Sequence, residues 1–422
     1  MTRKNIVIGA LLVWAAAVAA SAQLSDSVIE PGHAAIRYGG EPTERVAELN
    51  RRLASGETRL DFQAQAGYLR GLLAALDVPV ESQIVLFSGT SLQSRLINSR
   101  NPRTIFFNDS VAVAWMSGGL IEVASLDERQ GAVFYLLPQA QAPTPQLIRD
   151  TRCLQCHYST ATLGVPGFLV RSIPSATDGS ILPWLGNYTT DHRSPFEERW
   201  GGWYVTGRGG GRHLGNAPVA DRAARDLRVE NSNLNVTTLA DRFDARDYLS
   251  PLSDIVALLV FDHQMRTMNL LIRLGWEARI LEHDKRADAT TALAAAAVEV
   301  VDYLLFVDEA PLDRVQGTSG FAAQFSARGP RDSKGRSLRD LDLERRLMRY
   351  PCSYMIYSDA FNALPPTARD AVYRRMWQVL SGADATPKYA RLSPADRQAI
   401  VEILRDTKSD LPDVFSPRPS RP

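Results

Sequence analysis

The chain contains few cysteines and no repeated metal-ligand motif. It has three cysteines and six histidines in 422 residues. Cys153 and Cys156 form one C-x-x-C pair, and no second pair or H-x₃₋₅-H pattern accompanies it. A closed structural zinc site needs four ligands, so the sequence disfavours one. Cys352 has no obvious partner, and we expect it to be a small core residue rather than half of a disulfide.

The sequence also lacks a hydrophobic run long enough to suit a membrane helix near its start. The apolar stretch from Ile6 to Ala20 is shorter than the roughly 18 to 20 residues that such a helix prefers. Arg3 and Lys4 precede it, and small residues end it at Ala20-Ser21-Ala22. This pattern predicts a secretory signal peptide at residues 1–22, cleaved after Ala22. We therefore expect a periplasmic or otherwise exported protein with no membrane span after cleavage.

A block of basic residues is missing as well. Loss of Arg3 and Lys4 with the signal peptide leaves 46 basic and 47 acidic residues. Neither sign of charge is clustered in a way that would suit contacts with phosphates. Nucleic acid is therefore not an expected partner.

Apolar periodicity and turn residues predict an α+β fold that is mainly α. Residues 23–140 read as a mixed α/β region with a small antiparallel β-rich part. Residues 141–250 read as a loop-rich segment and residues 251–422 as a helical region, with no internal repeat. The Gly- and Pro-rich loops of the middle segment are the expected place for a functional site.

The individual elements follow from the same patterns. Helices are predicted at 42–53, 62–76, 251–283, 290–306, 338–349, 366–380 and 394–406. Strands are predicted at 82–88, 103–108, 111–116, 120–124 and 132–137, as in a small antiparallel meander. Ser393 to Asp396 is close to a capping box. Residues 313–337 are expected to form a long loop.

A specific chemistry is indicated by the segment Cys153-Leu154-Gln155-Cys156-His157. Two thiols three positions apart, followed at once by an imidazole, suit covalent attachment of haem. Each thiol can form a thioether with a haem vinyl group while His157 binds the iron from one side. The chain's own Cys and His frequencies give about 3 × 10⁻⁴ such motifs by chance.

A redox dithiol is the main competing interpretation of the two cysteines. It would be favoured by a strand that ends just before Cys153 and a helix that begins there. The preceding residues 142–152 are instead predicted to be helical, with Thr144 as N-cap and Pro145 in the first turn.

The second axial position of the iron has several candidates. His213 is the first choice because the glycines of Gly209 to Gly211 would let backbone approach a porphyrin closely. His192 is the second choice because Ser194 and Glu197 resemble a capping box that would hold it on a rigid helix entry.

Both histidines have other possible roles. Each could be structural, or could act as a distal acid or base above an open iron position. His263 and Met116 are weaker candidates. A histidine on an apolar helix is more often a hydrogen-bonded core residue, and a methionine at the end of a strand more often packs in the core.

Aromatic and basic residues lie close to these histidines in the sequence. Trp203 could wall the porphyrin edge, and Arg199 or Arg212 could pair with haem propionates. Ordinary core packing for the tryptophan and surface exposure for the arginines remain open alternatives for each residue.

The motif from Cys153 to His157 resembles the signature of c-type cytochromes. The wider chain, including Glu198 to Gly207 and His213 to Asn216, is similar to exported bacterial proteins known only as cytochrome c-like. The resemblance implies one covalent haem c, thioethers at Cys153 and Cys156, iron ligation by His157 and haem attachment after export. Small cytochromes also supply a methionine downstream, whereas no methionine lies between Met116 and Met265 here. A His/Met ligand pair is therefore in question.

Three functions are compatible with this sequence. The first is an exported monohaem cytochrome that transfers electrons to a redox partner protein. The second is a haem-dependent, peroxidase-like oxidoreductase with an open or displaceable sixth position, in which His192, Arg199 or Arg212 would assist proton movement on a small-molecule substrate. The third is a haem-based sensor or binding module. Whether the protein is an enzyme stays open, but a single C-x-x-C-H motif disfavours a di-haem peroxidase.

Overall fold

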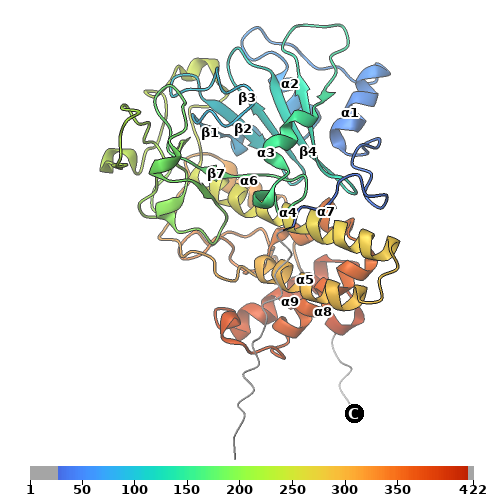
Figure 1. Ribbon diagram of the computed structural model, residues 1–422. Helices are drawn as coiled ribbons and strands as arrows, with labels where there is room; N and C mark the ends of the chain where they lie inside the picture. The colour runs from blue at the N-terminus through green and yellow to red at the C-terminus, as the bar shows by residue number, and fades with distance from the viewer. Residues whose placement is uncertain (1–26, 417–422) are drawn as a thin grey trace, which may run out of the picture.

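The computed structural model describes residues 27–416, and the predicted signal peptide lies outside them. The fold is α+β and mainly α, as predicted. An antiparallel sheet forms the upper part of the molecule in Figure 1, and a group of helices from the C-terminal half lies beneath it.

The main sheet has seven strands in the order β6-β5-β4-β3-β2-β1-β9. Its strands are β1 (Ile84–Leu86), β2 (Arg103–Phe107), β3 (Val111–Trp115), β4 (Ile121–Asp127), β5 (Gly131–Leu137), β6 (Ile148–Arg149) and β9 (Trp203–Tyr204). Strands β1 to β5 pair with their sequence neighbours and are antiparallel, which confirms the predicted meander. A separate pair joins β7 (Arg171–Ser172) and β8 (Tyr188–Thr189).

Each strand places alternate side chains on opposite faces, because the side-chain period of a strand is two residues. In β3, Val111 and Val113 enter one hydrophobic core, whereas Ala112 and Ala114 face the other. The first core is closed by α1 (Arg45–Ala54) and α2 (Leu69–Ala75). The sheet is therefore the middle layer of the fold.

The second core lies between the sheet and α4 (Ile255–His283). This helix has 29 residues, and nearly all of those up to Trp276 are buried. Among the described residues it is the one helix long and apolar enough to cross a membrane, yet 94% of its most apolar stretch is buried inside the protein. Its uniform hydrophobicity is explained by neighbours on all sides, as expected for a central core helix.

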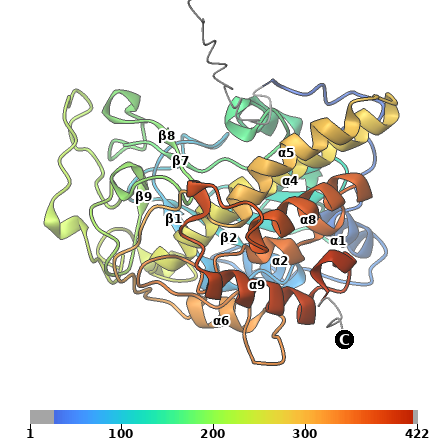
Figure 2. The ribbon, with the colours of Figure 1, turned by 90° about the horizontal axis from the view of Figure 1, so that it is seen from below.

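The remaining helices pack on α4 or on one another, and Phe321 in one of them also contacts Phe107 of β2. They are α5 (Ala289–Leu304), α6 (Phe321–Ala327), α7 (Asp359–Asn362), α8 (Pro366–Leu380) and α9 (Pro394–Thr407). Figure 2 shows α8 and α9 stacked below α5 and α4. The capping box predicted at Ser393 and Asp396 is present at the start of α9.

Two predictions about helices in this part are wrong. Residues 338–349 form turns because the side chain of Asp342 accepts hydrogen bonds from the backbone of Glu344 and Arg345, and Leu343 has a φ of 60°. Such a side-chain bond offers the backbone an alternative to helix. The long loop predicted at 313–337 also contains α6.

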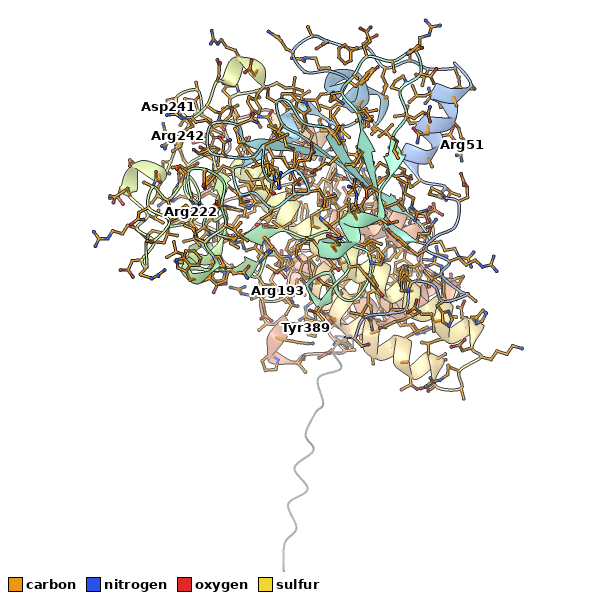
Figure 3. All side chains as sticks on the ribbon, turned by 45° about the horizontal axis from the view of Figure 1, so that its top comes forward. Arg51, Arg193, Arg222, Asp241, Arg242 and Tyr389 are labelled. Atoms are coloured by element: carbon orange, nitrogen blue, oxygen red, sulfur yellow. The ribbon has the colours of Figure 1, made fainter. Side chains whose placement is uncertain are left out.

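The segment 141–250 is loop-rich, as predicted. Its regular elements are strands of two residues, single turns of 3₁₀ helix and the four-residue helix α3 (Leu154–His157). Figure 3 labels Arg222, Asp241 and Arg242 on these loops, at the side of the sheet.

Candidate functional site

The C-x-x-C-H motif begins directly after the edge strand β6. Ile148 and Arg149 pair with Leu136 and Tyr135 of β5, so residues 142–152 are not the predicted helix. The carboxylate of Asp150 then accepts a hydrogen bond from the backbone N–H of Arg152 at 2.9 Å and starts a 3₁₀ turn, Thr151–Cys153. This turn leads into α3, which carries Cys156 and His157.

His157 is held in one orientation by the loop that follows it. Its Nδ1 lies 2.9 Å from the carbonyl oxygen of Gly167, and the Gly167 N–H donates back to the His157 carbonyl at 2.9 Å. Its ring lies 4.8 Å from that of Phe134 in β5. The described residues give Nε2 no hydrogen-bond partner. A ring whose Nδ1–H bonds a backbone carbonyl presents Nε2 as a metal ligand.

The loop that orients His157 is itself fixed by α4. Asn269 accepts a hydrogen bond from the Phe168 N–H at 2.8 Å and donates one to the Phe168 carbonyl at 2.7 Å. A Cβ on Gly167 would lie 2.4 Å from the Asn269 side-chain oxygen, so glycine is required for this close approach. Residues more than 100 positions apart therefore set the direction of the His157 ring.

The protonation state of His157 also suits a ligand. Burial lowers the pKa of His157, and the bond to the Gly167 carbonyl only partly offsets this effect. The imidazole is therefore neutral at neutral pH, which is the form that binds metals.

The two thiols of the motif are free and lie at the surface edge. Cys153 is half-buried and Cys156 is exposed. Burial, with a smaller contribution from the carboxylate of Asp150, raises the pKa of Cys153 to about 12. A reactive dithiol needs a lowered pKa. A strand does end shortly before Cys153 and a helix does follow, as a dithiol would favour, but the four residues of α3 leave Cys153 without a stabilised thiolate.

An open apolar surface lies beside the motif on the α4-facing side of the sheet. We call it the alanine shelf, and it consists of Ala112, Ala124, Leu136 and Ile148. Ala112 pairs across the strands with Ala124, and Leu136 pairs with Ile148. Ile148 is 58% exposed, and Ala112, Ala124 and Leu136 are half-buried.

Exposure is unusual for central strands of a seven-stranded sheet. The shelf's alanine side chains are small and only half-buried, so this part of the sheet stays partly exposed. It adjoins His157 through Phe134, which pairs with Ala124 and contacts the histidine ring. Figure 1 shows α3 in front of this part of the sheet. A flat apolar group bound at His157 would find a complementary surface here.

One ion pair lies at an end of the shelf. Arg103 is 3.2 Å from Glu122, which pairs with Ala114 across the strands. Glu122 also accepts hydrogen bonds from Ser91 at 2.5 Å and Gln93 at 3.0 Å. Both charges are close enough to His157 to influence its pKa: Arg103 lowers it and Glu122 raises it.

The site is a surface shelf rather than an enclosed cavity. The pockets found among the described residues are lined by other side chains. One of about 470 Å³ lies between α6 and residues 335–350, where Arg336 is already bonded to Asp332 and Glu402.

His192 lies in a buried polar chain against α4. Its Nδ1 is 2.7 Å from Nδ1 of His263, and Nε2 of His263 is 2.7 Å from the Ser353 hydroxyl. Both rings stack on Tyr303, with centroid distances of 4.0 and 5.3 Å. The capping box predicted at Ser194 is absent, since Pro195 precedes the 3₁₀ turn Phe196–Glu198.

The hydrogen-bonded side chains Ser353, His263 and His192 are arranged like the nucleophile and base of a hydrolase. However, Ser353 and His263 are fully buried and His192 is only 2% exposed. Burial lowers the pKa of His263 to about 3 and that of His192 well below its usual value. The three groups are therefore neutral interior partners that no substrate reaches.

Arg199 lies in the same interior, paired with Asp262. Asp262 accepts hydrogen bonds from Trp200 and Thr190, both at 3.2 Å, and Arg199 is 3.5 Å away. Arg199 also donates to the His192 carbonyl at 2.9 Å. Burial raises the pKa of Asp262 to about 6, and Arg199 lowers it. The Arg199 guanidinium is therefore paired inside the core and does not reach the motif. Nearby Arg193, labelled in Figure 3, pairs with Asp191 at 2.6 Å.

His213 is 3% exposed and, among the residues described, has no recorded contact with His192 or His263. Its Nδ1 accepts a hydrogen bond from the Gly215 N–H at 3.1 Å, and its ring meets that of Trp200 edge-on at 5.2 Å. Burial lowers the pKa of His213 to about 4. No hydrogen bond, ion pair or ring contact within residues 27–416 joins His213 or His192 to the motif, so their role as iron ligands stays a prediction.

The two other predicted haem contacts are also placed elsewhere. Trp203 is buried on β9 and donates its indole N–H to the Arg171 carbonyl at 2.7 Å. Arg212 is exposed and donates to the Val229 carbonyl at 2.7 Å. In the described part of the chain, neither has a recorded contact with Cys153, Cys156 or His157.

Sequence reasoning missed the alanine shelf, the Arg103 and Glu122 pair and the Gly167 carbonyl. The alternation in Val111-Ala112-Val113-Ala114 carried a signal, because it places small residues on a single face of a strand. Nothing in the sequence indicated that this face would stay partly uncovered.

Compared with protein-family models, with curated proteins and with solved structures, the chain matches none. The chemistry of the site therefore has to come from its own residues and geometry.

Proposed function

We propose that this protein is an exported monohaem c-type cytochrome that transfers electrons through one haem held by Cys153, Cys156 and His157. The observation that carries the proposal is the state of His157. Its Nδ1 is bonded to the Gly167 carbonyl, its Nε2 has no partner among the described residues, and its ring borders the alanine shelf.

The residues present fit a covalent haem. Cys153 and Cys156 are both free; Cys153 is the N-cap of α3, and Cys156 lies within α3, just before His157. The shelf would support the apolar porphyrin, and Arg103 supplies a positive charge for a propionate. When bound, the haem supplies a one-electron iron couple.

This chain's own residues would then control the environment of that couple. The Gly167 carbonyl accepts the Nδ1–H bond of His157, which makes the imidazole a stronger donor to the iron. Exposure of Cys156 keeps one edge of the site near solvent, where a redox partner protein can approach.

A haem-dependent oxidoreductase is the second candidate. It is favoured by the burial of His192 and His213, neither of which has a recorded contact with the motif among the described residues. If neither supplies that ligand, the second axial position is open to a small molecule. Arg199, committed to Asp262, would then not assist proton movement.

The test is to export the full chain in cells with haem-maturation machinery and to measure the intact mass of the purified protein. We expect one covalent haem in the wild type and none in the Cys153→Ser, Cys156→Ser double variant. A colourless wild-type protein, or a double variant that keeps the haem mass, would contradict the proposal.

EPR of the oxidised protein separates the two candidates. A low-spin ferric signal indicates two strong axial ligands and supports electron transfer. A high-spin signal, together with carbon monoxide binding after reduction, supports the oxidoreductase.

A further inference from the structure

Two of the six histidines meet a carboxylate on the surface, at the C-terminal end of α4. His283 is the last residue of α4 and Asp284 follows it, whereas His33 comes from the N-terminal segment of the described chain. His33 Nε2 is 3.6 Å and His283 Nδ1 is 2.9 Å from the same oxygen of Asp284. One ligand atom from each residue lies within 4.8 Å of the others.

The donor set is that of a transition-metal site. Two imidazole nitrogens and one carboxylate oxygen suit Zn²⁺ and Cu²⁺, whereas Ca²⁺ and Mg²⁺ prefer oxygen ligands alone. The side chains of His33, Asp284 and His283 are 26%, 42% and 51% exposed, so an ion reaches them from solvent and keeps water in its remaining positions.

We propose that His33, His283 and Asp284 bind one divalent transition-metal ion, Zn²⁺ or Cu²⁺, at the surface. The site does not depend on haem. In the metal-free protein His283 Nδ1 donates to Asp284, and His33 Nδ1 accepts from the Ala35 N–H, so the ring proton of His33 is on Nε2. On binding, each ring proton shifts to the other nitrogen, and His33 gives up its 3.2 Å contact with the Ala35 N–H.

The ion would fasten the N-terminal segment to α4. This segment also contacts the loop after the haem motif, since the Ile29 N–H donates to the Gly164 carbonyl at 2.9 Å and the Tyr158 hydroxyl donates to the Ile29 carbonyl. At its start, the Ser27 carbonyl accepts a hydrogen bond from Arg273 of α4. Metal binding at His33 would therefore stabilise a segment that packs against Tyr158.

The experiment titrates the full-length exported protein with zinc chloride by calorimetry and with Cu²⁺ by EPR. The Cys153→Ser, Cys156→Ser background is measured in parallel, because free thiols beside His157 would bind zinc themselves. We expect one ion per chain in both proteins and a Cu²⁺ signal with two nitrogen ligands.

His33→Ala and His283→Ala are the test variants. Loss of an outer-shell partner already costs about 10- to 100-fold in metal affinity, so loss of a direct ligand should cost at least as much. Each variant should also lose one nitrogen coupling, which a general loss of stability would not produce. Asp288→Asn is the matched control: this exposed carboxylate pairs with Arg286 at 2.9 Å, and its removal should leave the affinity unchanged.

Either of two results would overturn the proposal. One is the absence of a one-to-one metal complex in the thiol-free protein. The other is wild-type affinity in both histidine variants, since the ion would then bind elsewhere. Neither result bears on whether haem is attached at Cys153 and Cys156.

Discussion

His157 and His192 make an instructive comparison, because both are single histidines in the loop-rich segment and both touch an aromatic ring. His157 is half-buried, with one nitrogen bonded to the Gly167 carbonyl and the other without a partner in the described residues. His192 is 2% exposed, bonded to His263 and stacked on Tyr303. The first geometry presents a ligand, and the second completes a core.

The difference teaches that a histidine is available for chemistry only where its neighbours leave a nitrogen both oriented and accessible. Around His157, Phe134 of β5 contacts the ring, and Asn269 of α4 holds the loop that bonds its Nδ1, but the alanine shelf stays partly exposed. Around His192, α4 and α5 both contribute side chains that fill the space. Four predictions test this contrast.

The largest effect is expected from the motif histidine itself. His157→Ala should abolish the native axial ligation of the haem while the thioethers remain, because no other motif side chain replaces the imidazole. His192→Gln should leave the absorption spectrum unchanged. Absorption and EPR spectra of the two purified variants measure this.

His213→Gln extends the same test to the first-choice sixth ligand. A low-spin signal that persists in this variant would remove His213 as a ligand, and a changed signal would restore it. A wild-type spectrum in His157→Ala would contradict the ligand role of His157.

The buried ion pair of Asp262 and Arg199 should make a large contribution to stability in the core around His192. Asp262→Ala leaves Arg199 buried without its counter-charge, and breaking such a pair typically costs about 3–5 kcal/mol of unfolding free energy. Denaturant unfolding monitored by circular dichroism measures it. The control, Asp244→Ala, removes an exposed carboxylate that pairs with Arg246 and should leave the unfolding free energy unchanged. Equal effects in both variants would contradict the contrast.

Acid should destabilise the protein through its buried histidines. The pKa of His213 is about 4 in the folded state and near 6.5 when unfolded, so the unfolded state binds the proton first as pH falls. Stability should therefore decrease from about pH 6.5 down to about pH 4, by about 3 kcal/mol for this residue. His213→Gln should remove that share of the slope, measured by unfolding at several pH values. An unchanged slope would show that His213 is protonated in the folded protein or bound to iron.

The smallest effect on stability is expected on the shelf. Ala124→Phe adds a large side chain to a half-buried position beside the core, so the unfolding free energy should fall by about 1–3 kcal/mol. The shelf would be blocked, and the yield of covalent haem per chain should fall severalfold. Ala124→Ser, which keeps the volume small, should keep the yield. Equal haem content in the two variants would exclude the shelf as a contact surface.

Much of the fold could be predicted because its signals are local. The alternation of β2 to β5 and the capping box at Ser393 depend on neighbouring residues, and both were predicted at nearly the observed positions. The helix predicted over residues 142–152 failed because Ile148 and Arg149 pair with β5, a tertiary interaction that outweighs the favourable cap at Thr144.

The candidate site also has one part that the sequence predicts and another that depends on tertiary contacts. The motif was recognisable because the spacing of two thiols and an imidazole is a property of five consecutive residues. The surroundings were not, because the Gly167 carbonyl is positioned by Asn269 and the shelf is assembled from four strands.

The sequence by itself determined which side chains can form thioethers, that an imidazole follows them, and that a β-rich part precedes a helical one, because these features depend on covalent order and short periods. Only the tertiary structure decided which histidine keeps an accessible ring and which is buried in the core. Burial depends on contacts between residues far apart in the chain, and no local pattern records them.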